Sequence, residues 1–430
     1  MSEDVQGVES GIGQHDAETV LPCGRAWRHF VSTGSAIGLL AFLCVGLAPE
    51  AMASDVQSKQ WYLDAMRSDA MWKVSTGEGI KVAVVDSGVA VTPSLKGRVL
   101  AGKDATGLKG GALEDYKGHG TTMAELIVGS GRGGGLKGLA PGAEVISFRT
   151  SLGGVKGNKE SDSAEAIRAA ADSDAQIINM SFGDDLMYTA EADAVRYAAS
   201  RGKLMFASVG NDAQKKNFIG YPAAYPGVTG ISAADRSGKV AKYSEVGEYV
   251  DLAAPGLDIP QWCDATFRSY CDGGGGTSAA TALASASAAL IWSKHPNWTA
   301  NQVLRVLIDT ASRSWAKDEP SDYLGYGLVR PSWHLLKNKG NPGPPDIDPI
   351  TNKKTPGAGS VASGSSKKKP STPPSQPPKD AGDSKPAAAV KSSRSGEDDG
   401  GPMWIVAGSV AAAVVIGGAA FALVRKRRNA

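Results

Sequence analysis

Cysteine is scarce in this chain of 430 residues, which contains only four. Cys23 and Cys44 lie in an N-terminal leader, so an exported and processed chain would keep only Cys263 and Cys271. In an oxidising compartment two cysteines at that spacing favour one local disulfide, which would stiffen the segment that follows it. Two free, buried thiols are the alternative interpretation.

A strong excess of charge is also missing, because 46 basic and 44 acidic residues leave a formal net charge of +2. A charge this close to zero argues against a nucleic-acid-binding protein.

No loop has the ligand spacing of a calcium site, so we expect no metal and no cofactor. Asp184, Asp185 and Asp272 are interpreted as solvated loop acids.

Charge is absent from two long apolar runs near the ends of the chain. The first, residues 31–47, follows two arginines and ends at a small-x-small pattern, which predicts a signal peptide with a long leader over residues 1–53. The second, residues 403–424, is long enough to span a bilayer and precedes a basic tail, residues 425–430. A buried core helix is the alternative for this second run. Together the runs predict a single-pass cell-membrane protein with an extracytoplasmic body.

Large apolar residues are almost missing from residues 341–402, which are rich in Pro, Ser, Lys, Gly and Ala. Such a composition cannot bury enough surface to fold. We therefore expect a disordered linker here, which holds a globular domain of residues 54–340 away from the membrane.

Short β-branched runs alternate with helical patterns along residues 54–340. The alternation predicts an α/β domain with a mostly parallel sheet, helices on both faces, and ligands at the carboxyl ends of the strands. A capping box at Thr299 begins one helix, and residues 61–72 indicate a short amphipathic helix at the start of the domain. The expected buried strands are 80–85, 144–148, 176–180, 203–207 and 227–232, and the expected helices are 163–171, 189–200, 279–292 and 300–312.

Three polar residues stand where these elements begin or end. Asp86 directly follows the first strand, where a carboxylate can orient an imidazole, although Asp-Ser-Gly also commonly caps a turn. His119 lies between two glycines at a helix start, where the low steric bulk suits a general base; a capping or core histidine is the alternative. Asn211 follows the fourth strand, where its amide can donate to an oxyanion, or can simply form a turn.

A fourth candidate, Ser278, is preceded by the glycines 273–276 and lies at the first turn of the helix 279–292. Glycines allow backbone and substrate to approach closely, and the helix dipole favours developing negative charge at this end. Plain packing of a Gly-rich turn into an Ala-rich helix is the alternative. The order Asp86, His119, Asn211, Ser278 favours nucleophilic catalysis over the four separate alternatives.

In this order and in their local motifs the four residues resemble those of the subtilisin-like serine proteases. The matching motifs are 82–88, 118–121, 210–211 and 276–280, and the similarity extends over roughly residues 60–335. The resemblance implies a subtilisin-like fold and a triad of Asp86, His119 and Ser278, with Asn211 and the Ser278 backbone N–H holding the oxyanion. The expected activity is hydrolysis of peptide bonds in a polypeptide substrate through an acyl-enzyme.

The same resemblance implies where a substrate binds. Ser181, Phe182 and Gly183 resemble the strand that pairs with the substrate backbone. Small residues and no buried charge in the pocket for the residue before the scissile bond favour an apolar side chain there. The residues that resemble the walls and floor of that pocket are Ser208, Val209, Gly210 and Gly220.

The chain departs from the family's motifs at two places. Ala282 stands where a proline is usual, a change that helix geometry tolerates. Met123, Ala124 and Glu125 replace the usual valine, alanine and glycine after the histidine motif, which puts an acid close behind His119.

The predicted architecture of signal, protease domain, proline-rich linker and C-terminal spanning helix resembles that of the mycosins. These are membrane-anchored subtilisin-like proteases of type VII secretion, so the resemblance implies the secretion machinery as a partner and secreted proteins as substrates. A non-catalytic anchored scaffold that binds peptide or secretion components is the alternative. The presence of all four chemical residues favours the enzyme.

Overall fold

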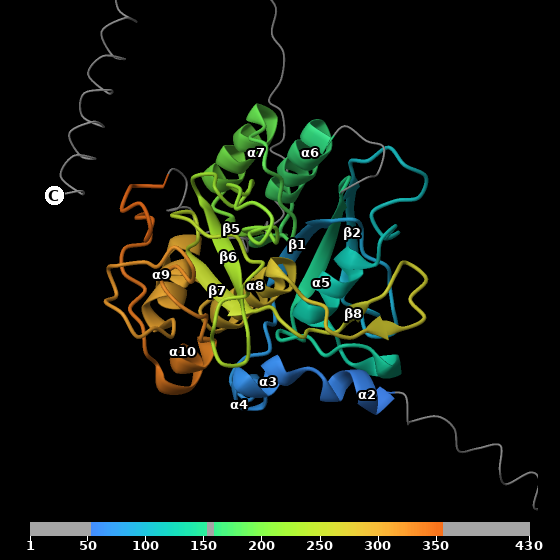
Figure 1. The fold of residues 1–430 in the computed structure, drawn as a ribbon, viewed down its shortest axis with the longest axis horizontal. Helices are drawn as coiled ribbons and strands as arrows, with labels where there is room; N and C mark the ends of the chain where they lie inside the picture. The colour runs from blue at the N-terminus through green and yellow to red at the C-terminus, as the bar shows by residue number, and fades with distance from the viewer. Residues whose placement is uncertain (1–52, 153–158, 356–430) are drawn as a thin grey trace, which may run out of the picture. The chain divides into compact units, whose positions relative to one another are not determined.

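A seven-stranded parallel sheet lies at the centre of the computed structural model, which describes residues 53–152 and 159–355 (Figure 1). The strand order is β2-β3-β1-β4-β5-β6-β7, and neighbouring strands pair in parallel. The five expected strands are confirmed, whereas β2 and β7, at the two edges, were not predicted. The bounds are β1 (Lys81–Asp86), β2 (Val99–Asp104), β3 (Glu144–Arg149), β4 (Ile177–Met180), β5 (Leu204–Ser208), β6 (Val228–Ala234) and β7 (Leu252–Pro255).

Helices cover both faces of the sheet, as expected from its continuously apolar strands (Figure 1). Val82 and Val84 of β1 belong to a hydrophobic cluster with α5 (His119–Val128) and α8 (Thr277–Lys294). Ala83 and Val85 belong to a second cluster with α6 (Lys159–Asp172) and α7 (Thr189–Ser200). Side chains alternate between the faces of a strand, so one strand contributes to both cores.

The helix α8 is buried along almost its whole length, from Thr277 to Trp292. Its sequence is rich in Ala and Ser, because a helix surrounded by strands and by α5 has little space for large side chains. The approach to it requires glycine: Gly275 has a φ of 118°, and a Cβ there would lie 2.1 Å from the Gly256 carbonyl oxygen. After it come α9 (Ala300–Thr310), with the expected capping box at Thr299, and α10 (Pro331–Lys337).

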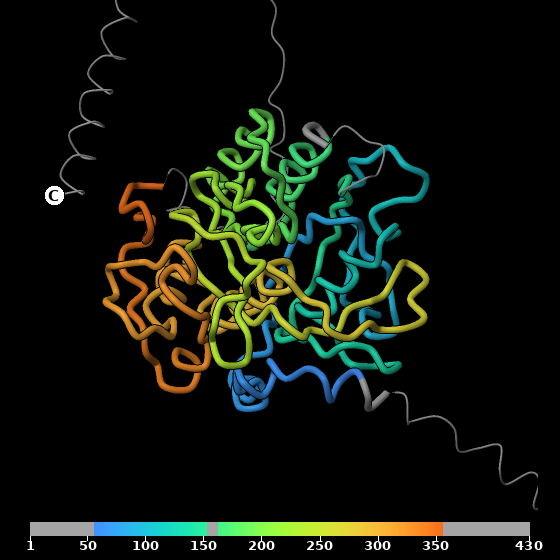
Figure 2. Tube along the Cα trace, viewed as in Figure 1, coloured from blue at the N-terminus to red at the C-terminus, as the bar shows by residue number. Residues whose placement is uncertain are grey.

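The segment ahead of the sheet forms short helices and not the single helix expected over residues 61–72. The bounds are α2 (Ala53–Ser58), α3 (Trp61–Ala65) and α4 (Ser68–Trp72). Arg67, with a φ of 66°, breaks the chain between α3 and α4. The break lets Tyr62 and Met71 both enter the first hydrophobic cluster, where each is fully buried. Figure 2 shows this segment as the blue trace along one side of the domain.

The packed part of the chain extends past the boundary expected at residue 340. The Pro345 carbonyl accepts a 2.7 Å hydrogen bond from the Thr299 hydroxyl, and the Ile347 carbonyl accepts one of 2.7 Å from Arg305. Ile350 packs against the first hydrophobic cluster. A stretch with few apolar residues is therefore held on α9 chiefly through its backbone carbonyls.

The leader up to residue 52, the linker from residue 356, the spanning segment 403–424 and the tail 425–430 lie outside the described residues. Within residues 53–152 and 159–355, none of the helices has the length and apolarity to cross a membrane.

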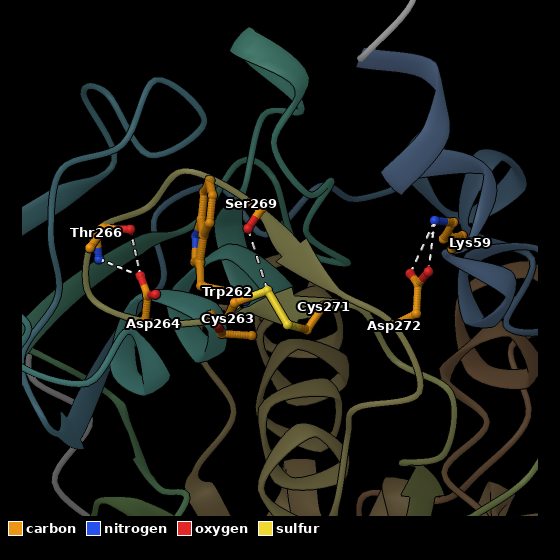
Figure 3. The surroundings of a disulfide bond; sticks show 9 residues. Lys59, Trp262, Cys263, Asp264, Thr266, Ser269, Cys271 and Asp272 are labelled. Carbon is orange, nitrogen blue, oxygen red and sulfur yellow. Dashed lines mark hydrogen bonds and ion pairs between the residues drawn. A yellow bond between two sulfur atoms is a disulfide. The ribbon is translucent and has the colours of Figure 1, made fainter.

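A small hairpin carries the disulfide ahead of Ser278 (Figure 3). Its strands are β8 (Gln261–Trp262) and β9 (Tyr270–Cys271), and Cys263 is joined to Cys271 with their Cα atoms 5.0 Å apart. The Trp262 and Tyr270 rings stack at 3.8 Å. Asp272 forms an ion pair of 3.0 Å with Lys59, so the hairpin is also tied to the segment that leads into α3.

Glu125 joins this hairpin to α5. Its carboxyl is buried and accepts hydrogen bonds of 2.6 Å from the Thr92 hydroxyl and of 2.6 Å from the Tyr270 hydroxyl. The acid that the sequence places close behind His119 is therefore bonded to Thr92 and the hairpin and not to the imidazole. Its environment suits a neutral carboxyl, because burial raises the pKa of Glu125 to about 7.

We predict that Glu125 makes the fold less stable as the pH rises from about 4.5 to about 7. The unfolded chain releases the proton at the lower pH, whereas the folded protein retains it up to the higher one. The free energy of unfolding should fall by up to about 3 kcal/mol over this window. Urea unfolding of the wild type and of Glu125→Gln at pH 5 and pH 7.5 measures the change. The loss should be smaller in the variant, and an identical loss in both proteins would contradict the assignment.

Candidate active site

Three of the predicted site residues are brought to one end of the sheet by three different elements. Asp86 is the last residue of β1, His119 the first of α5, and Ser278 the second of α8. His119 Nδ1 lies 2.7 Å from Asp86 Oδ1; the Asp86 side chain is fully buried and that of His119 is 30% exposed. The imidazole thus has one edge fixed by a carboxylate and remains partly open to solvent.

The pair determines the proton affinity of the imidazole. Burial lowers the pKa of His119, but the charge of Asp86 and its hydrogen bond outweigh burial, so the pKa lies above its ordinary value of 6.5. Asp86 Oδ1 also accepts the Ser87 backbone N–H at 2.7 Å, whereas its Oδ2 is buried without a hydrogen-bond partner among the described residues. The Asp86 carboxylate therefore contacts His119 through Oδ1 only.

Asp115, which the sequence analysis missed, holds the loop that carries His119. Its Oδ1 accepts the Gly118 backbone N–H and the Ser87 hydroxyl, both at 2.8 Å, and its Oδ2 accepts the Thr121 backbone N–H at 2.8 Å. The three donors lie on both sides of His119 and next to Asp86. An aspartate a few residues before a glycine is a common turn signal, and it could have been read as such here.

The Ser278 side chain is hydrogen-bonded to the neighbouring strand end. Its hydroxyl donates to the Ser181 carbonyl at 2.9 Å, and the Ser181 hydroxyl donates to the Ser278 carbonyl at 2.9 Å. Asn179 of β4 continues this network by donating to the Ser181 hydroxyl at 2.9 Å and accepting from Ser285 of α8 at 3.0 Å. No hydrogen bond joins Ser278 Oγ to His119 within the part of the chain that the structure describes.

The orientation of the Asn211 amide is fixed by Thr277. Asn211 Oδ1 accepts the Thr277 backbone N–H at 3.0 Å and the Thr277 hydroxyl at 3.1 Å. Two donors on one side identify that atom as the oxygen, so the amide nitrogen is the atom left to donate. Asn211 lines the same cavity as Ser278.

Two cavities adjoin these residues and share Phe182, Gly183 and Asp184. One, of about 230 Å³, is lined by His119 and Ser181, and the other, of about 400 Å³, by Ser278. Val209 lines neither cavity; its side chain is fully buried in the second hydrophobic cluster. The other predicted pocket residues, Ser208, Gly210 and Gly220, do line the larger cavity.

The expectation that this pocket holds no buried charge is wrong. Glu245, only 4% exposed, lines the larger cavity. Burial raises the pKa of Glu245 to about 7, against the opposing effect of backbone hydrogen bonds at Phe218 and Asp212. Asp184 and Asp185 line the cavity as well, so they are not merely solvated loop acids.

The described residues contain no group of His, Cys, Asp and Glu arranged to hold a metal ion. The side chains that the structure brings together are a hydroxyl, an imidazole paired with a carboxylate and an amide donor, and they lie at a helix N-terminus. These are the groups of nucleophilic acyl transfer.

Comparison with known proteins gives similarities along most of the described chain. Residues 77–327 match the subtilase family. A thermophilic serine proteinase of Bacillus sp. (strain AK1) is 34% identical over 54% of this chain and 56% of its own length, and subtilisin Savinase of Lederbergia lenta is 30% identical over 64% and 97%. The chain thus spans only about half the length of the first of these relatives. A solved structure of the MycP3 protease from the type VII (ESX-3) secretion system is 30% identical, with a TM-score of 0.55, over 64% of this chain and 87% of that one.

We predict that the Asp86 carboxylate is the main group that keeps the pKa of His119 above its ordinary value. In Asp86→Asn burial should outweigh the smaller effect of the Asp115 charge, so the pKa should fall below 6.5. An NMR titration of the His119 ring proton, assigned with His119→Gln, measures it. Asp64→Asn, at an exposed site away from the pair, is the control and should leave the pKa unchanged. A raised pKa that persists in Asp86→Asn would show that another group holds the proton.

Proposed function

Residues 77–327 of this chain belong to the subtilase family of serine peptidases, and from that premise we propose that the protein is a membrane-anchored extracytoplasmic serine endopeptidase. The observation that carries the proposal is the 2.7 Å hydrogen bond between His119 Nδ1 and the buried Asp86 carboxylate. A histidine held in this way has its other ring nitrogen available as a base. The His119 side chain is 30% exposed and lines a cavity, which supports access of a substrate to the imidazole.

In the proposed mechanism Ser278 Oγ attacks the carbonyl carbon of the scissile bond while His119 Nε2 takes its proton. The tetrahedral oxyanion accepts hydrogen bonds from the Asn211 amide nitrogen and the Ser278 backbone N–H, at the N-terminus of α8. His119 then protonates the leaving amine, and the acyl-enzyme forms. Water, deprotonated by the same imidazole, releases the acid and restores Ser278. Asp86 stabilises the imidazolium in both steps.

Before attack, the Ser278 hydroxyl has to leave the Ser181 carbonyl and turn toward His119. We propose that a rotation about its Cα–Cβ bond achieves this, while α8 and the hydrogen bond from the Ser181 hydroxyl hold the Ser278 backbone. Catalytic hydrogen bonds are often long or misaligned without substrate and tighten when it binds. We infer that the substrate backbone, pairing with residues 181–183, competes for the Ser181 carbonyl and so frees the nucleophile.

We propose that residues 1–53 export the chain, that residues 403–424 anchor it and that the linker between keeps the domain at a distance from the membrane. The charge-free runs and the flanking basic residues support this topology. A solved relative with 30% identity is a protease from a type VII secretion system, which supports such a system as the partner and its secreted proteins as substrates. The whole protein's substrates and partners remain part of this proposal.

A second candidate is a non-catalytic scaffold with the same fold. It is favoured by one observation, the engagement of the Ser278 hydroxyl with Ser181 in place of His119. In a scaffold this hydrogen bond would persist, and the cavities beside residues 181–183 would bind peptide without cleaving it.

We predict that a fluorophosphonate probe labels the full-length protein, purified in detergent, and that Ser278→Ala abolishes the labelling. An activated serine reacts with this electrophile, whereas an ordinary serine does not. Labelling should also weaken as the pH falls through the raised pKa of His119, because the protonated imidazole cannot accept the Ser278 proton. Ser287→Ala, which removes another buried serine of α8 whose hydroxyl donates only to the Leu283 carbonyl of the same helix, is the control and should still be labelled.

Absence of labelling in a folded wild-type protein would contradict the enzyme and favour the scaffold. Labelling that survives in Ser278→Ala would move the nucleophile elsewhere.

A further inference from the structure

The cavity beside Ser278 has an acidic wall for which the proposed mechanism has no use. Glu245 lies in the loop between β6 and β7, and its backbone N–H donates to the Gly210 carbonyl at 3.1 Å. Its carboxyl lies directly against Gly210, because a Cβ on that glycine would lie 2.2 Å from Glu245 Oε2. A Cβ on Gly220 would lie 3.4 Å from the same oxygen. The absence of a side chain on Gly210 therefore makes room for this carboxyl in the lining of the cavity that Ser278 also lines.

All the ionisable side chains that line this cavity are acidic. Besides Glu245, its lining includes Asp184, Asp185 and Asp212, and no Lys, Arg or His among the described residues lines it. Lys215 forms an ion pair of 2.8 Å with Asp212, but both side chains are largely exposed. No ion pair to Glu245 occurs within residues 53–152 and 159–355. A cavity with several acids and no cation raises the local concentration of positively charged groups.

A buried carboxylate without a cation is unfavourable when ionised, which agrees with the pKa of about 7 that burial gives Glu245. The charges of Asp212 and Asp185 add to this effect. A positively charged partner in the cavity would reverse the balance, since it stabilises the ionised carboxylate in an environment of low dielectric. The protein contains no such partner among its described residues, so the natural source is the substrate.

We propose that Glu245 determines specificity by binding a lysine or arginine side chain at the substrate residue before the scissile bond. The inference rests on the proposed peptidase function of Ser278. The alkyl stem of such a side chain lies between the backbones of Gly183 and Gly210, and its charged head meets the Glu245 carboxyl. The substrates are thus polypeptides cleaved after a basic residue, and not after the apolar residue that small pocket walls alone favour.

The test uses the full-length protein in detergent and peptides that differ only at the residue before the scissile bond, which is Lys, Arg, Leu or Gln. In the wild type kcat/KM should be about 100-fold higher for Lys and Arg than for Leu. Glu245→Gln keeps the shape of the side chain and removes the charge, so this preference should fall to within a few-fold of unity, with kcat/KM for Leu little changed. Asp251→Asn is the matched control: Asp251 is also buried with a pKa of about 7, but it does not line the cavity.

A wild type that prefers Leu, or a basic preference that survives in Glu245→Gln, overturns the proposal. If the variant does not fold, inhibition of the wild type replaces it as the test. Benzamidine carries a positively charged amidinium and should compete with the Lys peptide, whereas neutral benzyl alcohol should not. Absence of inhibition by benzamidine then overturns the proposal.

The proposed function fails in a different way, through the absence of any Ser278-dependent hydrolysis of the four peptides. In that event calorimetric binding of benzamidine still tests the cavity. Binding by the wild type that is lost in Glu245→Gln supports the acidic pocket, and no binding by the wild type excludes it.

Discussion

Burial of α8 is the constraint on which the rest of the site depends. A helix packed against five strands of the sheet and against α5 has to carry small side chains, and the chain that leads into it also has little space for side chains. Both requirements appear in the glycines 273–276 and the alanines and serines that follow. Gly275 passes so close to the Gly256 carbonyl that no Cβ fits between them. The helix N-terminus, with Ser278 in its first turn, is thereby fixed at the ends of the strands that carry Asp86 and precede Asn211.

Three buried acids show how the same functional group is used differently around this frame. Asp86 contacts an imidazole and raises the pKa of that imidazole. Glu125 faces two hydroxyls and suits the neutral form, which connects α5 to the disulfide hairpin. Glu245 faces a cavity lined by other acids and has no cation beside it among the described residues. The difference lies in what each carboxyl touches, because all three are almost completely buried.

The sequence predicts the parts of this structure that depend on local pattern. Buried strands such as β1 and β4 are recognisable because both faces are apolar, and α7 is recognisable from its helical spacing. The edge strand β2 is not predicted from the sequence, since most of Val99–Asp104 is exposed and resembles a loop. The break between helices at Arg67 is not predicted either, because it depends on the packing of Tyr62 and Met71 against elements that are distant in the sequence.

The site residues also divide into those that a local motif indicates and those whose position depends on distant parts of the chain. Asp86, His119, Asn211 and Ser278 lie in short motifs next to recognisable elements, so their roles can be proposed from sequence. Glu245 occurs in a polar loop, and nothing local indicates that its carboxyl packs against Gly210 in the lining of the cavity. Val209 was placed in the pocket because its neighbours are there, but side chains alternate at a strand end and this one points into the core.

Asp86, His119, Asn211 and Ser278 should act together in acyl transfer, and the structure of a covalent adduct would reveal whether they do. A crystal structure of the protein after reaction with a peptidyl phosphonate bearing lysine next to the phosphorus would show every role together. We expect a bond from Ser278 Oγ to phosphorus, with the phosphoryl oxygen about 3 Å from the Asn211 amide nitrogen and the Ser278 backbone N–H, and with His119 beside the Ser278 oxygen. An adduct on Ser278 whose phosphoryl oxygen faces away from Asn211, or whose oxygen is out of reach of His119, would contradict this expectation.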